Sequence, residues 1–391
     1  MSSTILSAAA MMRAAEATTG LSDWGRDIFR KPFEVLIDDL NTTARLTPLG
    51  AERAYRRLFD NLCARLKITA DRKRFPAIST EDVRRPIFVI GLPRAGTTFF
   101  HNLLCADPVN RSPLTWEIMY PSPPPEEDTY ATDPRIAQAS EAMAFEGFME
   151  PDLLAIHPFD ALRPEECNFF WEYSFLTVNY SAWWDAPNYN ALLYSTDFRE
   201  VYAEEREVLQ LLQSRLRRDR WVLKTPAHIA WMEALVDVFP DALFVQCHRD
   251  PAKIIPSLSN NLTVWRRTFS DDVKPSDFGM MEHQAEGLRK LAALRSRPGM
   301  SERFYDAHYL DVQADPIAVL RGCYKKFGIE FSAQREASVR AWMDEDRASH
   351  AKGPKHAYAL KDFDLDLEKI DRVYANYFTD FNVAKERAKP A

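Results

Sequence analysis

The chain has 391 residues, of which 46% are hydrophobic and 12% aromatic, and its formal net charge is −7. This composition excludes a disordered chain and supplies a sizeable core. The acidic balance argues against nucleic-acid binding, which needs a basic surface. Five scattered cysteines without a CxxC pair indicate a reduced, cytoplasmic protein without a zinc cluster or disulfide framework. No apolar run approaches the ~20 residues that span a bilayer.

Residues 1–80 carry apolar side chains at helical spacing, with polar faces between them. Thr47 and Pro48 are typical of a helix start, as the N-cap and the first helical residue. We therefore predict a helical N-terminal extension over residues 1–80, followed by one α/β domain over residues 81–391. The extension is a candidate for shaping an acceptor pocket or a homodimer face, although packing against the main domain is its more ordinary role.

The most informative stretch is Arg85–Leu104, which reads RPIFVIGLPRAGTTFFHNLL. Ile87–Ile90 is a short apolar run of β-favouring residues and predicts a buried strand. Gly91 and Gly96 delimit a loop, and helical spacing begins at Thr97. A strand, a glycine-rich loop and a helix start together favour anion binding, because the first N–H groups of a helix have no partner within it.

This loop nearly matches the P-loop of nucleotide triphosphatases, since Gly91 and Gly96 have the right separation. However, Thr97 stands where that motif has its phosphate-reaching lysine, and the cation lies inside the loop at Arg94. A guanidinium is a planar fork suited to phosphate or sulfate. The departure makes a triphosphatase a poor candidate.

The segment 157–194 holds the densest aromatic cluster of the chain. Its members are Phe159, Phe169, Phe170, Trp171, Tyr173, Phe175, Tyr180, Trp183, Trp184 and Tyr189. Most are expected in the core, and a pocket for an apolar acceptor is the less common alternative. The same segment contains Glu165 and Glu166 beside a proline turn.

Two further strand–helix pairs follow, with strands predicted at Trp221–Leu223 and Ala242–Cys247. Such alternation predicts a parallel sheet with helices on both faces, whose ligands bind at the carboxyl ends of the strands. Arg94, Lys224 and Arg249 each come just after a predicted strand. We therefore expect them in one shared site.

The last predicted strand is Phe304–Tyr309, followed by a helix over Pro316–Phe327 and a basic loop at Ala351–His356. The predicted fold class is thus α/β, a P-loop-like parallel sheet flanked by helices, with the N-terminal helical extension.

The loop sequence LPRAGTT resembles the 5′-phosphosulfate-binding loop of sulfotransferases, which move a sulfuryl group from 3′-phosphoadenosine 5′-phosphosulfate (PAPS) to an acceptor. The resemblance runs from about residue 85 to the end and is closest to the bacterial branch with a helical N-terminal extension. It implies PAPS as co-substrate, adenosine 3′,5′-bisphosphate as product, and no metal. The donor-binding residues that it implies in this loop are Arg94, Ala95, Gly96, Thr97 and Thr98.

Other segments extend the resemblance. Arg249, with Ser257 eight residues later, matches the arginine and serine that hold the 3′-phosphate of the donor, although an ion pair with a neighbouring acid would also explain the arginine. Tyr309 resembles the tyrosine near the adenine, where stacking would hold the base. Lys352 and Gly353 resemble the late lysine–glycine pair over the 3′-phosphate, and a solvated basic turn is the alternative.

The chain departs from the family at two places in this loop. Ala95 replaces the usual serine, which removes a side-chain hydrogen bond worth roughly 0.5–1.5 kcal/mol but keeps the backbone N–H. Arg94 replaces the usual lysine. Because arginine keeps its proton, Arg94 can stabilise charge on the leaving oxygen but cannot donate a proton to it.

Several residues are candidates for the catalytic step, in which a base removes the proton of an acceptor hydroxyl or amine. The segment LKTPAH resembles the family's LKTH, which makes His228 the first candidate base, although it lies two residues later than the family's histidine. Glu165 or Glu166 is the second candidate. Lys224 is expected near the transferred sulfuryl group.

Two alternatives remain open beside a sulfotransferase. A P-loop kinase of small molecules would bind ATP with magnesium, and a nucleotide-binding protein without catalysis would bind the donor without turnover. The sequence does not name the acceptor, and the aromatic segment favours a small apolar or aromatic molecule.

Overall fold

A computed structural model describes residues 5–276, 278–350, 360–363 and 365–387. The chain divides into two compact units, each built from three segments. The first, here called the helical unit, comprises Met1–Val83, Pro113–Arg218 and Leu262–Lys274, and the second, called the sheet unit, comprises Arg84–Ser112, Asp219–Asn261 and Pro275–Ala391. The first boundary lies near the predicted one at residue 80, and the helical unit also includes two later segments.

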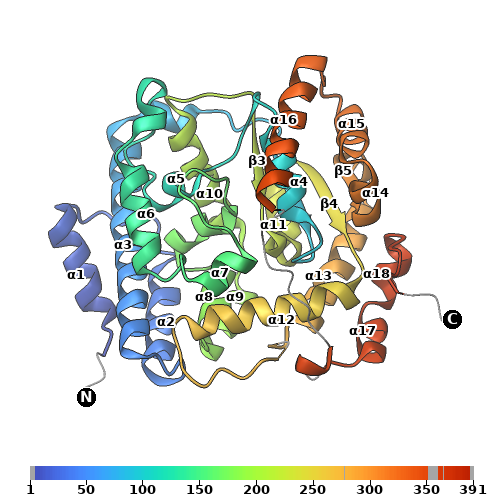
Figure 1. Ribbon diagram of the computed structural model, residues 1–391. Helices are drawn as coiled ribbons and strands as arrows, with labels where there is room; N and C mark the ends of the chain where they lie inside the picture. The colour runs from blue at the N-terminus through green and yellow to red at the C-terminus, as the bar shows by residue number, and fades with distance from the viewer. Residues whose placement is uncertain (1–4, 277, 351–359, 364, 388–391) are drawn as a thin grey trace. The chain divides into compact units, whose positions relative to one another are not determined.

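The helical unit is built from helices of very different lengths. Its α-helices are α1 (Ala8–Thr19), α2 (Arg30–Thr42), α3 (Pro48–Arg74), α5 (Thr115–Met119), α6 (Arg135–Phe145), α7 (Pro151–Ile156), α8 (Val178–Trp183), α9 (Pro187–Ser195) and α10 (Arg199–Gln213). Its 3-10 helices are η1 (Pro76–Thr80), η2 (Glu127–Thr132) and η3 (Cys167–Ser174). Helix α3 begins as predicted, with Pro48 at its first turn and the Thr47 side chain accepting from Gly50 N at 2.9 Å. Figure 1 shows α1 beside α3.

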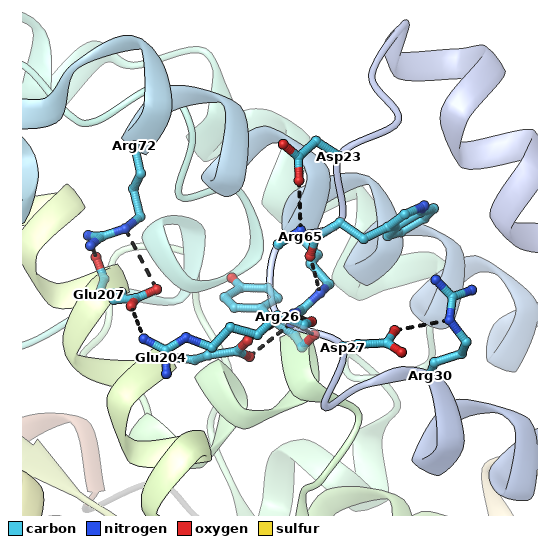
Figure 2. Close-up of polar contacts among 11 residues, drawn as sticks. Asp23, Arg26, Asp27, Arg30, Arg65, Arg72, Glu204 and Glu207 are labelled. Atoms are coloured by element: carbon cyan, nitrogen blue, oxygen red, sulfur yellow. Dashed lines mark hydrogen bonds and ion pairs between the residues drawn. The ribbon is translucent and has the colours of Figure 1, made fainter.

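An arginine-rich network fixes the loop between α1 and α2 onto α3 and α10 (Figure 2). Arg65 donates through both terminal nitrogens to the carboxylate of Glu204 at 2.8 Å, and Arg26 pairs with Glu207 at 2.6 Å. Arg72 lies 3.7 Å from the same Glu207. Arg65 also donates to backbone carbonyls of the loop, so its buried charge is well satisfied. These contacts hold the loop between α1 and α2 against α3 and α10 within the helical unit.

The core of this unit is aromatic, and all ten aromatic side chains singled out in the segment 157–194 are buried. Arg57 of α3 lies among them with its side chain 5% exposed. Its Nε donates to Glu172 at 2.7 Å and its Nη1 to Glu146 at 3.2 Å, and both carboxylates are buried. Asn61 and Asn179 donate to Glu172 as well. The aromatic segment is thus core that encloses a buried ion cluster.

The sheet unit alternates strands and helices. Its strands are β1 (Ile87–Gly91), β2 (Asn110–Arg111), β3 (Arg220–Lys224), β4 (Leu243–His248) and β5 (Phe304–His308). Its helices are α4 (Thr97–Cys105), η4 (Pro226–Trp231), α11 (Met232–Val238), α13 (Met280–Arg295), η5 (Ser301–Arg303), α14 (Tyr309–Ala314), α15 (Pro316–Phe327), α16 (Ala333–His350), η6 (Leu360–Phe363), α17 (Leu367–Val373) and α18 (Ala375–Asp380). Helix α12 (Pro251–Arg267) begins in the sheet unit, and its residues from Leu262 onward belong to the helical unit.

The five strands form one sheet in the order β2-β3-β1-β4-β5, and every neighbouring pair is parallel. All residues of β1 and β4 are buried, as expected for strands covered on both faces. The predicted α/β fold with a parallel sheet is therefore confirmed (Figure 1). Only the two-residue strand β2 was not predicted, because it is too short for a recognisable pattern.

The order of the sheet brings the carboxyl ends of β1, β3, β4 and β5 to one edge. The predicted last strand ends one residue earlier than expected, so that Tyr309 begins α14. No helix in the described part of the chain is long and apolar enough to cross a membrane.

Candidate active site

The loop between β1 and α4 turns sharply at two glycines. Gly91 has φ +142°, and a Cβ on it would lie 2.4 Å from the carbonyl oxygen of Cys247 on the neighbouring strand. Gly96 has φ +92°, a conformation that favours glycine, and it caps α4. Arg94 between them also has a positive φ, of +67°. The loop is thus held in a conformation that most sequences would not adopt.

Helix α4 starts immediately after this loop, with Phe100 N donating to Gly96 O at 3.1 Å. The N–H groups of the preceding first turn have no carbonyl partner within the helix, and they carry the positive end of its dipole. Thr97 is buried and Thr98 exposed at this end. Lys224, at the end of β3 and 1% exposed, donates to the hydroxyl of Thr98 at 3.4 Å. Cation, hydroxyl and helix start therefore meet at one place.

A second group of predicted residues lies against the same loop. Arg94 donates from Nε to the hydroxyl of Ser257 on α12 at 3.1 Å. Arg249 donates from Nη1 to Arg94 O at 3.4 Å. The Arg249 guanidinium carbon lies 3.8 Å from the centre of the Tyr309 ring, and a Cβ on Gly96 would lie 3.5 Å from that ring. The structure thus brings together Arg94, Arg249, Ser257 and Tyr309, which lie far apart in the sequence.

A buried network supports the strand ends below these residues. His248, which precedes Arg249, stands opposite His308 in the register of β4 and β5, and their rings stack at 4.9 Å. The His248 Nε2 lies 2.8 Å from Asp306, which also receives two hydrogen bonds from Arg295 at 2.6 and 2.7 Å. Burial opposes ionisation of Asp306, but its bonds with Arg295 and His248 outweigh burial and lower its pKa. This network fixes the positions of the residues that follow both strands.

One further side chain reaches Arg249. Glu386, in the C-terminal segment after α18, accepts from Arg249 Nε at 3.1 Å. The sequence offered no signal for it, because residues 381–387 match no motif and the two partners are 137 positions apart.

The two candidate bases, His228 and Glu165, are both buried but have different partners. His228 on η4 is fully buried, with its ring edge-on to Phe88 at 5.0 Å, and burial lowers its pKa to about 3. Glu165, in the helical unit, accepts from its neighbour Glu166 N at 2.7 Å. Its other oxygen lies 2.9 Å from Nε2 of His157, whose side chain is 21% exposed. No sequence motif marked this histidine. Lys352 and Gly353 lie outside the described residues.

A comparison with protein-family models matches residues 86–333, more than half of the chain, to a sulfotransferase family. The chain belongs to this family. The match includes the β1–α4 loop, Lys224, Arg249, Ser257 and Tyr309.

This sulfotransferase is also similar to solved structures. Sulfotransferase STF1 from Mycobacterium tuberculosis H37Rv is 30% identical, with a TM-score of 0.83 over 95% of this chain and 99% of the other. Sulfotransferase STF9 from Mycobacterium avium is 28% identical, with a TM-score of 0.84 over 99% of this chain and 100% of the other. Both alignments therefore extend beyond the residues 86–333 that the family model matches.

Among curated proteins, omega-hydroxy-beta-dihydromenaquinone-9 sulfotransferase Stf3 from Mycobacterium bovis is 26% identical over 265 residues. The same protein from Mycobacterium tuberculosis matches equally. The alignment covers 62% of this chain and 63% of the relative, so this sulfotransferase spans less than two thirds of the length of the curated relatives it matches.

We expect acid to destabilise the sulfotransferase through His228. Burial lowers the pKa of this histidine from 6.5 to about 3 in the folded state, whereas the unfolded chain takes up a proton below about 6.5. Between these pH values the unfolded state binds more protons, so stability falls as the pH falls, by up to ~1.4 kcal/mol per pH unit.

Urea unfolding of the wild type and of His228→Gln at pH 7, 6 and 5 measures this contribution. The wild type is expected to lose its stability advantage over the variant as the pH falls. Parallel losses in both proteins would assign the acid sensitivity to other groups.

Proposed function

We propose that this sulfotransferase takes its sulfuryl group from PAPS and transfers it to a hydroxyl of an apolar acceptor. The observation that carries the proposal is the convergence of three cations, Arg94, Lys224 and Arg249, on one sheet edge beside a helix start. A donor with a 5′-phosphosulfate and a 3′-phosphate needs two anion sites at a nucleoside's separation, with an aromatic ring for its base.

The residues fit these parts of the donor. The first N–H groups of α4 and the hydroxyls of Thr97 and Thr98 suit the 5′-phosphosulfate. Arg249 offers a planar fork, and Ser257 an additional hydroxyl, for the 3′-phosphate. Tyr309 offers a ring face for the adenine. Ala95 contributes its backbone N–H alone, and Lys352 and Gly353 remain predicted contacts to the 3′-phosphate.

The transfer itself is an in-line displacement at sulfur. The acceptor oxygen forms a bond to sulfur and gives its proton to a base, while the bond between sulfur and the 5′-phosphate oxygen breaks. Adenosine 3′,5′-bisphosphate leaves with the electron pair of that bond. Negative charge grows on the sulfuryl and leaving oxygens, so Lys224 and Arg94 would act mainly by stabilising charge.

Glu165 fits the role of the base better than His228. Both side chains are buried, with 3% exposed for Glu165 and 0% for His228, but a histidine with a pKa of about 3 accepts protons weakly near neutral pH. Glu165 has one oxygen fixed by a backbone N–H and the other near the partly exposed His157. These two contacts hold the Glu165 carboxylate in one orientation. Glu166, next in the chain, is the remaining candidate.

The acceptor class rests on similarity. The name of the relative Stf3 gives a hydroxyl-bearing menaquinone as its substrate. We extend this to a hydroxyl on an apolar or lipid-like molecule. The aromatic segment does not support this step, because its side chains form the core of the helical unit.

The direct test is thermal unfolding with adenosine 3′,5′-bisphosphate and, separately, with ATP and magnesium. At ~100 times its Kd a ligand stabilises the folded state by about 2.7 kcal/mol. We expect this gain with the bisphosphate for the wild type, and its loss in Arg249→Ala. Lys253→Ala removes an equally charged, exposed side chain of α12 and should keep the gain.

Stabilisation by ATP with magnesium, and not by the bisphosphate, would replace the proposal with a kinase. Stabilisation by the bisphosphate without turnover on any hydroxyl acceptor would indicate a binding protein instead.

A further inference from the structure

The C-terminal segment after α18 is anchored beside the end of β4. Glu386 N donates to the carboxylate of Asp250 at 2.8 Å. Lys385 and Arg387, on either side of it, pair with Asp371 of α17, at 3.0 Å for Lys385 and 2.6 Å for one nitrogen of Arg387. These contacts hold the backbone at Glu386 at a defined position next to Arg249.

The side chain of Glu386 occupies one edge of the Arg249 guanidinium. Nε lies 3.1 Å from one carboxylate oxygen and Nη2 lies 3.5 Å from the other. Nη1 donates to Arg94 O, and the Tyr309 ring covers a face of the group. The pair is largely shielded, with side chains 23% and 15% exposed for Arg249 and Glu386. The edge that would bind a phosphate through two N–H groups therefore already holds a carboxylate.

We propose that Glu386 is an internal competitor of the donor's 3′-phosphate. In the empty protein its carboxylate neutralises Arg249, and the 3′-phosphate must displace it when the nucleotide binds. A phosphate monoester carries nearly two charges and three acceptor oxygens, so it outcompetes one carboxylate. Glu386 returns to Arg249 as the product leaves. The inference deepens the proposed function and rests on the 3′-phosphate binding at Arg249.

The competition lowers affinity only for nucleotides that carry a 3′-phosphate. Adenosine 5′-phosphate leaves the pair between Arg249 and Glu386 intact, so its affinity does not depend on the carboxylate. Glu386 thereby reduces the affinity for both donor and bisphosphate product. Because product release limits the turnover of many enzymes, a group that replaces the departing phosphate favours turnover.

The test is titration calorimetry of Glu386→Gln with adenosine 3′,5′-bisphosphate and with adenosine 5′-phosphate. Glutamine keeps the length of the side chain and the backbone bond to Asp250 but removes the charge. We expect the bisphosphate to bind about tenfold more tightly, which corresponds to about 1.4 kcal/mol. The affinity for adenosine 5′-phosphate should change by less than about twofold. Glu386→Ala should give the same selectivity.

Glu368→Gln is the matched control, because Glu368 is an exposed glutamate at the start of α17 and its loss changes the net charge equally. Both affinities should stay at their wild-type values in this variant. An unchanged or weaker affinity of Glu386→Gln for the bisphosphate, or equal tightening of both nucleotides, overturns the inference while the proposed function stands. If the wild type does not bind the bisphosphate at all, the result contradicts both the inference and the proposed donor.

Discussion

Glu165→Gln is expected to lower kcat by about 10²–10⁴, the usual contribution of a general base, and to leave donor affinity nearly unchanged. Glutamine preserves the size of the side chain but does not accept a proton at neutral pH. His228→Gln is expected to retain kcat within about tenfold, because a buried imidazole with a pKa of about 3 is a weak base near pH 7.

The kcat of both variants is measured as the rate at which adenosine 3′,5′-bisphosphate is released from PAPS. The assay uses the best acceptor from a panel of phenols, alcohols and lipid-like hydroxyl compounds. Glu141→Gln is the matched control, since it removes an exposed carboxylate of α6 and should keep most of the activity. Loss of activity in Glu166→Gln but not in Glu165→Gln would assign the base to Glu166. Full activity of Glu165→Gln beside a folded but inactive His228→Gln would assign the base to the histidine.

Arg57→Met is expected to lower the free energy of unfolding by about 3–5 kcal/mol at neutral pH, because it leaves two buried carboxylates without their cation. Burial already disfavours the charged form of Glu146 and raises the pKa of this carboxyl to about 7, despite the attraction of Arg57. Glu172, the other partner, is fully buried at 2.7 Å from Arg57.

The loss of stability in Arg57→Met should depend on pH. Without Arg57, the pKa of Glu146 rises further above that of the unfolded chain. A carboxyl with a raised folded pKa contributes stability below its unfolded pKa, near 4.5, and loses this contribution as the pH rises. The difference between Arg57→Met and wild type should therefore be larger at pH 8 than at pH 5, as measured by urea unfolding.

Arg56→Met provides the matched control, because Arg56 is adjacent, has a side chain 47% exposed and pairs with Asp60 one turn away. An exposed pair of this kind contributes about 0.3–0.5 kcal/mol. Adding Glu172→Gln to Arg57→Met should recover part of the lost stability, because it removes one buried carboxylate that Arg57 no longer neutralises. Equal costs for Arg56→Met and Arg57→Met would show that the buried cluster does not stabilise the fold.

Much of the candidate site could be predicted from the sequence, because its parts are encoded locally. The run Ile87–Ile90 and the glycines after it specify a strand, a loop and a helix start within a few residues. The alternation of strands and helices predicts a parallel sheet, and parallel strands place their carboxyl ends on one edge. That rule alone was enough to expect Arg94, Lys224 and Arg249 together.

Other features depend on contacts between distant segments and carry no local pattern. Arg57 meets Glu172 across 115 positions, and Arg249 meets Glu386 across 137. The burial of His228, and with it the shift of its pKa, follows from packing around η4 rather than from the LKTPAH segment. The sequence by itself thus determined the fold class and the sheet edge at which Arg94, Lys224 and Arg249 lie, because periodicity and turn residues act over short distances. Only the tertiary structure decided which charges are buried and which partners neutralise them.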